Sequence, residues 1–260
     1  MTVERRHITG FSNPTVKALR ALREKKHRKA AGRFLAEGLR LLTDARECGH
    51  VPEVLVLADR REPHPLLAAL EASVAGAGGE IIETTPDILA KITGKDNPQA
   101  VAGVFAEFGT ALEAIERETA EIWLVAQALR DPGNLGTMLR TGDAIGAGGL
   151  ILIDDCADPF SVEAVRASMG AIFTQRIAQA RWDEFEPWLR CARPVGRGQP
   201  ARCAAVSRSA LCRALLRHGG QRIARIAGTV RNGLRLARDH ADEGPRRQPQ
   251  CCRSRGGSGV

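Results

Sequence analysis

The stretch IWLVAQALRDPGNLGTMLRTGDAIGAGGLILI, residues 122–153, decides the fold. Its first six residues form a nearly continuous apolar run, which is typical of a strand covered on both faces. The turn residues Asp131–Asn134 follow, and a helix is predicted over about 134–145, closed by Gly146–Gly149. Residues 150–153 are a second apolar strand. The stretch therefore predicts a strand, a helix and a second strand.

The same pattern continues further along the chain. Ser161 predicts the N-cap of a helix that runs to about Ile172, and residues 174–178 predict a third strand. Strands and helices in this alternation predict a parallel sheet with crossover helices. Because ligands of such sheets lie beyond the carboxyl ends of the strands, a site is expected in the loops after residues 129 and 153.

A smaller α/β unit is predicted before this sheet. Its helices are expected over 14–31, from Leu39, over 64–72 and over 86–92, and its strands over 33–36, 51–58, 80–83 and 99–106. We therefore expect a front domain (1–107), an acidic helical linker (108–121), a parallel-sheet domain (122–190) and a tail (191–260).

Charge is distributed unevenly along the chain. The 260 residues carry a net charge of +8, but residues 191–260 hold 15 Arg, no Lys and three acids. The first 190 residues therefore carry a net charge of −4. The same tail holds five of the seven Cys and no Phe, Trp or Tyr. A basic chain favours a nucleic-acid partner, yet here the whole excess comes from one segment of unusual composition.

Three residues near the head of the helix at 134 are candidates for chemistry. Asn134 can cap the helix while its amide contacts a ligand, and Gly136 allows another backbone or a ligand to approach closely. Arg140 can offer a planar guanidinium to phosphate or ribose oxygens. A capped helix with a solvated arginine is the simpler interpretation of these residues taken alone.

These residues stand in a recognisable motif. Asn134–Thr141, NLGTMLRT, resembles motif 1 of the SpoU (TrmH-type) RNA ribose methyltransferases of the SPOUT superfamily, N-x-G-x-x-x-R-[TA]. Asp158–Ala171 resembles that family's next block, with D-P-F followed by R-x-S-x-G-A. Arg33–Gly38, RFLAEG, resembles the opening of its L30e-like substrate-binding domain. The resemblance covers residues 8 to about 188 and implies an L30e-like α/β domain followed by a parallel-sheet α/β-knot domain.

The resemblance also implies a function. Family members transfer the methyl group of S-adenosyl-L-methionine to a ribose 2′-hydroxyl of ribosomal or transfer RNA. Arg140 would orient the attacking oxygen and favour its charge, and Asn134 would help to shape that site. No metal is expected, since the sulfonium is already a good leaving group. RNA is the implied partner, and a homodimer is implied if the knot domain is intact.

The resemblance and the charge pattern together give a set of expected substrate-binding residues. The basic members can face RNA phosphates, although a solvated helix face is an equally open interpretation. The set is Lys25, Lys26, Arg28, Lys29, Arg33, Glu37, Arg166 and Ser168.

The tail departs from the family pattern. The G-[NS]-E and S-L-N blocks with which the family wraps the methyl donor do not stand in 191–260. One hypothesis is a shifted reading frame: with suitable codons, Gly244–Gly256 moved by one base reads GRADSLNVAVAA. The tail would then be poorly structured, the cofactor-binding residues unknown, and the chain weakly active or inactive. The alternative is a non-catalytic RNA-binding protein that uses the tail as an arginine-rich arm.

Two further features bear on location and cysteine chemistry. The sequence shows neither an apolar run of membrane-spanning length nor a secretory signal, so a cytoplasmic protein is expected. The cysteines form no C-x-x-C pairs, so thiols without bound metal are expected.

Overall fold

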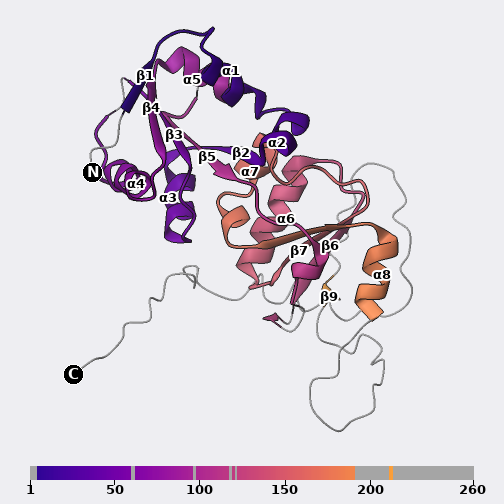
Figure 1. Ribbon diagram of the computed structural model, residues 1–260. Coiled ribbons are helices and arrows are strands. Elements are labelled where there is room, and N and C mark those ends of the chain that lie inside the picture. Colours follow the sequence, from indigo (N-terminus) through magenta and orange to yellow (C-terminus); the bar gives the residue numbers. More distant parts are fainter. Residues whose placement is uncertain are drawn as a thin grey trace, which may run out of the picture.

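The computed structural model describes residues 5–59, 62–95, 98–116, 119–120, 122–190 and 211–212. Two α/β units lie side by side, and each is built around its own sheet (Figure 1). Among the described residues, no helix is both long and apolar enough to cross a membrane.

A mixed five-stranded sheet forms the first unit. Its strands are β1 (Arg5–Ile8), β2 (Arg33–Glu37), β3 (Val54–Ala58), β4 (Glu80–Thr84) and β5 (Val101–Ala106). Their order is β1-β4-β3-β5-β2, with β1 and β3 parallel to β4, and β5 antiparallel to both β3 and β2. Each strand expected for this unit is present. The sequence did not predict β1, because three of its four residues are exposed and polar and give no apolar signal.

Five α-helices accompany this sheet. They are α1 (Pro14–Ala21), α2 (Lys25–Ala31), α3 (Leu39–Glu47), α4 (Pro65–Gly76) and α5 (Pro86–Thr93). The single helix predicted over 14–31 is wrong, because the chain forms α1 and α2 with a turn between them. The break leaves the carbonyls of Leu22 and Arg23 outside a helix, and the Arg28 guanidinium donates hydrogen bonds to both at 2.8 and 2.7 Å.

A four-stranded parallel sheet forms the second unit. Its elements are β6 (Trp123–Gln127), α6 (Pro132–Ala144), β7 (Gly149–Ile153), α7 (Val162–Ala167), the 3-10 turn η3 (Ala171–Phe173), β8 (Arg176–Ala180), α8 (Trp182–Arg190) and β9 (Leu211–Cys212). The strand order is β8-β7-β6-β9. The predicted alternation of strands and helices in a parallel sheet is therefore confirmed. Apart from Leu211 and Cys212, the predictions for the tail lie outside the described residues.

Two helix predictions in this region need correction. Ser161 does cap α7 by accepting a hydrogen bond from the Ala164 amide, but the helix ends at Ala167 instead of near residue 172. It ends there because Met169 and Gly170 both adopt positive φ, at 49° and 95°, which no α-helix accommodates. The helical linker expected near residues 109–121 contains no α-helix in its described part, where the 3-10 turn η1 (Leu112–Ala114) lies.

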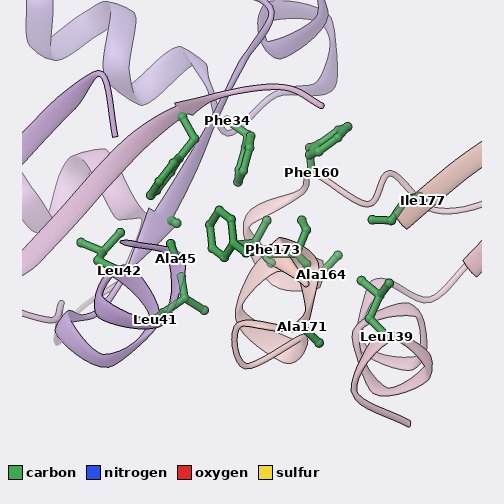
Figure 2. Close-up of a cluster of buried hydrophobic side chains, with 14 of the residues drawn as sticks. Phe34, Leu41, Leu42, Ala45, Leu139, Phe160, Ala164, Ala171, Phe173 and Ile177 are labelled. Carbon is green, nitrogen blue, oxygen red and sulfur yellow. The ribbon is translucent and has the colours of Figure 1, made fainter. Parts of the chain in front are cut away.

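A cluster of phenylalanines joins the two units (Figure 2). Phe34 of β2 lies 5.1 Å from Phe160 between ring centroids, and Phe105 of β5 lies 4.9 Å from Phe173 of η3. Phe108 packs edge-on against Phe34 at 5.5 Å. Because aromatic rings bury large apolar areas and interlock, this cluster makes one continuous core from both units. The domain boundaries at 107 and 121 stay a prediction, and Phe108 of the expected linker belongs to this core.

Candidate active site and RNA-facing surface

The carboxyl ends of β6, β7 and β8 meet at one edge of the second sheet. Ala128 and Asp154, which directly follow β6 and β7, adopt φ values of 52° and 59°. Positive φ is uncommon outside glycine and turns the chain sharply at this edge. The Asp154 carboxylate accepts hydrogen bonds from Gln127 Nε2 at 2.7 Å and from the Trp182 amide at 2.9 Å. Asp154 therefore ties the three strand ends together.

A buried thiol links the loops that follow β6 and β7. The Leu129 amide donates to Cys156 Sγ at 3.3 Å, and the thiol donates to the Ile153 carbonyl at 3.2 Å. Burial raises the pKa of the Cys156 thiol above its ordinary value, although hydrogen bonds from neighbouring amides lower it. A thiol that stays protonated is a poor nucleophile and a poor metal ligand, so Cys156 has a structural role.

Asp131, and not Asn134, caps α6. The Asp131 carboxylate accepts a hydrogen bond from the backbone amide of Asn134 at 2.6 Å, and Pro132 occupies the first helical position. Proline is favoured there because its missing N–H would have no partner at a helix start. The expectation that Asn134 is the cap is therefore wrong. Its half-buried side chain makes no hydrogen bond to another described residue.

Gly136 allows the backbone of a second helix, α7, to approach α6 closely. A Cβ atom placed on Gly136 would lie 2.4 Å from Ala167 Cβ and 2.7 Å from the Ser168 amide nitrogen. Both distances are far below van der Waals contact, so only glycine permits α6 and α7 to cross here. The inner face of α6 is closed by α7, and a ligand must meet α6 on its outer face.

Arg140 lies on that outer face. It is exposed, as are Thr137 and Thr141, and no ion pair or side-chain hydrogen bond joins it to another residue in the described part of the chain. Six residues separate it from Asn134, which on an α-helix corresponds to roughly 9 Å along the axis and about 120° around it. The helix alone does not place the two side chains on one face. Their assignment to one site stays a prediction.

Two members of the expected substrate-binding set lie at the end of α7. Arg166 is exposed. Ser168 is fully buried, and its hydroxyl donates to the Val165 carbonyl at 2.6 Å. The serine therefore closes α7 and has no free hydroxyl for RNA in this arrangement.

Arg28 is the member of the set whose position differs most from expectation. Its side chain is 2% exposed, and Nη2 donates to Asp158 Oδ2 at 2.6 Å. The predicted phosphate-facing role of Arg28 is therefore corrected: the guanidinium points into the junction between the two units. Glu107 lies nearby, and its pKa is raised by burial and then by the Asp158 charge, while Arg28 and Lys29 lower it.

Glu37 is also turned inward. Its side chain is 3% exposed, and the carboxylate accepts a hydrogen bond from the Gln99 amide at 2.7 Å and pairs with Lys95 Nζ at 3.1 Å. These contacts hold the segment before β5 against the end of β2. Glu37 thus supports the front domain and is not placed to touch RNA.

The remaining cations of the set are exposed as expected. Lys25, Lys26 and Lys29 form no salt bridge with a described carboxylate, whereas Arg33 pairs with Glu53 at 2.7 Å. Sequence reasoning missed three further exposed cations on α1 and in the turn after it, and the inward partner of Arg28. The missed residues are Lys17, Arg20, Arg23 and Asp158. Charge counting over 14–33, with eight basic residues and one acid, is the signal that could have found the first three.

Comparison with known proteins places the chain in a family. Residues 13–103 match the MRM3-like substrate binding domain, and residues 121–196 match the SpoU rRNA Methylase family. A solved rRNA methyltransferase from Sinorhizobium meliloti is 40% identical, with a TM-score of 0.66 over 72% of this chain and 70% of that one. The chain belongs to the SpoU rRNA methylase family, which confirms the family and fold-class predictions.

Curated relatives agree with this assignment. The 23S rRNA (guanosine(2553)-2′-O)-methyltransferase RlmP of Bacillus subtilis is 31% identical over 65% of this chain and 62% of its own length. An uncharacterized tRNA/rRNA methyltransferase of Synechocystis is 35% identical over 63% of this chain and 58% of its own. The chain thus spans about six tenths of the length of each of these two relatives.

Proposed function

We propose that this protein is an RNA ribose 2′-O-methyltransferase that uses S-adenosyl-L-methionine. The observation that carries the proposal is the position of the NLGTMLRT motif on α6, which starts at the carboxyl edge of a parallel sheet in a SpoU-family chain. The Bacillus relative is named for 2′-O-methylation of 23S rRNA, and the Sinorhizobium protein has also been solved with AdoMet bound. These relatives favour ribosomal RNA as the substrate.

The reaction transfers one methyl group. The bond between carbon and the sulfonium sulfur breaks, its electron pair stays on sulfur as a neutral thioether, a bond between carbon and the ribose 2′-oxygen forms, and the hydroxyl proton passes to water. Negative charge develops on the 2′-oxygen before the transfer is complete. An exposed guanidinium on the outer face of α6, such as that of Arg140, can orient this oxygen and stabilise that charge.

We assign described residues to the RNA side of the reaction and none of them to the donor side. Three polar groups near the carboxyl edge are bound within the protein: Asp154 accepts from Gln127, Asp131 accepts from the backbone amide of Asn134, and Cys156 accepts from the backbone amide of Leu129. None of them is assigned to the methyl donor. The donor-binding role therefore falls to residues beyond these, and the reading frame of the tail decides whether this chain has them.

RNA binding is assigned to the segment that forms α1 and α2. The exposed cations lie close together along this segment, and an exposed cationic surface without ion-paired carboxylates suits contacts to the phosphate backbone. Phe11, which is 53% exposed in the loop before α1, adds an aromatic surface on which a base can stack. The cations are Lys17, Arg20, Arg23, Lys25, Lys26 and Lys29.

The alternative of a non-catalytic RNA-binding protein is not favoured, because the relatives are methyltransferases and the basic surface proposed here lies outside the tail. A homodimer and a cytoplasmic location stay predictions.

The proposal is tested by incubating the full chain with methyl-labelled S-adenosyl-L-methionine and in-vitro-transcribed 23S rRNA. A second sample uses a chain whose gene has been corrected by one base within codons 185–200. We expect label in RNA from the corrected chain and little or none from the chain as it stands. Labelling by neither chain would contradict the function, and equal labelling by both would contradict the shifted frame.

The shifted frame has a simpler test of its own. We expect the gene sequence around codons 185–200 to allow a one-base change that restores the G-[NS]-E and S-L-N blocks. A gene that encodes neither block in any frame would contradict the hypothesis while leaving the family assignment unchanged.

A further inference from the structure

A buried ion pair joins helix α2 of the front unit to the loop before α7 of the second unit. Arg28 and Asp158 lie 130 positions apart in sequence, and their side chains are 2% and 12% exposed. Besides the bond to Asp158, the same guanidinium donates to two backbone carbonyls at the end of α1. One side chain thus fixes α1, α2 and the second unit relative to one another.

Asp158 extends this connection into the aromatic cluster. While its Oδ2 accepts from Arg28, its Oδ1 accepts from the Phe160 amide at 3.0 Å. The Phe160 ring packs on Phe34, which stands three residues after the last residue of α2 (Figure 2). The ion pair and the ring contact therefore hold the same two segments together at two separate points.

The loop held by Arg28 is in turn bonded to the loop that leads into α6. The Ala157 amide donates to the Leu129 carbonyl, and the Leu129 amide donates to Cys156 Sγ. Two residues after Leu129, Asp131 caps α6. A short series of hydrogen bonds thus runs from Arg28 to the start of the helix that carries Asn134 and Arg140.

Cohesion between the two units does not require an ion pair. Hydrophobic contact is non-directional, and the phenylalanine cluster already supplies it. A buried charge pair is a costly way to add cohesion, because apolar residues of similar size often do as well or better. What a guanidinium with three bonded acceptors adds is a fixed orientation.

The orientation that is fixed is that of the lysines on α2. Lys25 and Lys29 are one turn or less from Arg28, and with Lys26 they are exposed while the arginine is buried. Because the helix is short and its arginine is anchored, these lysines have a set position relative to the second unit, and Figure 1 shows α2 close to α7.

We propose that Arg28 and Asp158 are an interdomain positioning pair. The pair holds the exposed lysines of α2 (Lys25, Lys26 and Lys29) at a fixed position relative to the carboxyl edge of the second sheet. An RNA strand bound by the lysines is thereby presented to the outer face of α6. This inference rests on the proposed function, since it requires that α2 and α6 contact the same RNA. Arg28 is a positioning residue and touches neither the RNA nor the methyl donor.

Amide hydrogen exchange of the full chain, with and without in-vitro-transcribed 23S rRNA, tests the proposal. In the unmodified chain we expect RNA to slow exchange by about tenfold both in α2 and over residues 130–137 at the start of α6. In Arg28→Met, RNA should still slow exchange in α2 and no longer over 130–137. The matched control is Arg5→Met, which removes an arginine that pairs with two carboxylates inside the front unit. In Arg5→Met, RNA should still slow exchange both in α2 and over residues 130–137.

Two further variants separate positioning from simple stability. Asp158→Asn keeps the size of the side chain and an acceptor for the Phe160 amide, and it should lose protection over 130–137 as Arg28→Met does. Arg28→Lys keeps the charge and should recover part of that protection. The proposal would be overturned if protection of 130–137 across the variants correlated with their melting temperatures and not with the presence of the charge pair.

The failure of the inference can be told from the failure of the proposed function. Equal RNA protection of both segments in Arg28→Met overturns the positioning role and leaves the methyltransferase assignment intact. If RNA protects neither segment of the unmodified chain, both fall together.

Discussion

Helices α2 and α6 each carry one arginine, and the two arginines lie in opposite surroundings. Arg28 of α2 is buried, and it donates hydrogen bonds to one carboxylate and two carbonyls. Arg140 of α6 is exposed, with no bonded partner among the described residues. One guanidinium is used to assemble the protein, and the other is left available to a ligand.

The other residues of each helix lie in surroundings opposite to those of its arginine. The outer face of α2 is charged and exposed, while the inner face of α6 is so closely packed on α7 that Gly136 has no room for a methyl group. Function is therefore expected from the lysines of α2 and the arginine of α6. Substitutions of the two arginines should separate stability from activity.

The largest expected effect is the loss of stability in Arg28→Met. Removing one partner leaves Asp158 as an uncompensated buried charge, which costs about 3–5 kcal/mol of unfolding free energy. Denaturant unfolding measures this. Arg5→Met, whose arginine is half exposed, should cost only about 0–1 kcal/mol. Equal losses in the two variants would show that the junction is not special.

Arg140→Ala is expected to lower activity while leaving stability nearly unchanged. In the frame-corrected chain, kcat for RNA methylation should fall by about 10²–10³-fold, because a group that stabilises developing charge is lost. The free energy of unfolding should change by less than about 0.5 kcal/mol, as is usual for exposed positions. A stable variant with undiminished kcat would remove Arg140 from the site.

Gly136→Ala should disturb α6 from its inner face. The added methyl group would overlap Ala167, and such overpacking typically costs about 1–3 kcal/mol. Gly76→Ala in α4 is the matched control, because a Cβ there meets nothing within 4 Å. That control should be neutral or stabilising by up to about 1 kcal/mol. Thermal unfolding distinguishes the two, and an equally stable Gly136→Ala would contradict the close helix crossing.

The smallest effect concerns the start of α6. Asp131→Ala removes the cap and should destabilise the chain by about 1 kcal/mol. Asn134→Ala should leave the unfolding free energy nearly unchanged and lower methylation in the frame-corrected chain. If the two variants exchanged these effects, Asn134 would be the cap after all.

Much of the fold could be predicted from local sequence pattern. Apolar runs such as Trp123–Gln127 and Gly149–Ile153 identify buried parallel strands, and the family motifs identify α6 and α7. β1 escaped prediction because its exposed arginines hide the strand, and their carboxylate partners come from residues far along the chain.

The candidate site was less predictable, for a physical reason. Arg28 stands in a basic run that shows no periodicity, and whether it is buried depends on Asp158, 130 positions away. The cap of α6 could have been found, because Asp131 directly precedes a proline and aspartate is a preferred N-cap. Charge favours an exposed position for every cation of the run, and this holds for Lys25, Lys26 and Lys29 but not for Arg28.

Mapping of the methylated nucleotide tests the central claim most directly. A ribose whose 2′-oxygen carries a methyl group cannot attack the adjacent phosphate, so that one linkage resists alkaline hydrolysis. We predict that 23S rRNA treated with the frame-corrected chain and S-adenosyl-L-methionine gains one resistant linkage, which is absent with Arg140→Ala. RNA that gains no resistant linkage, or that is methylated only on bases, would contradict the account.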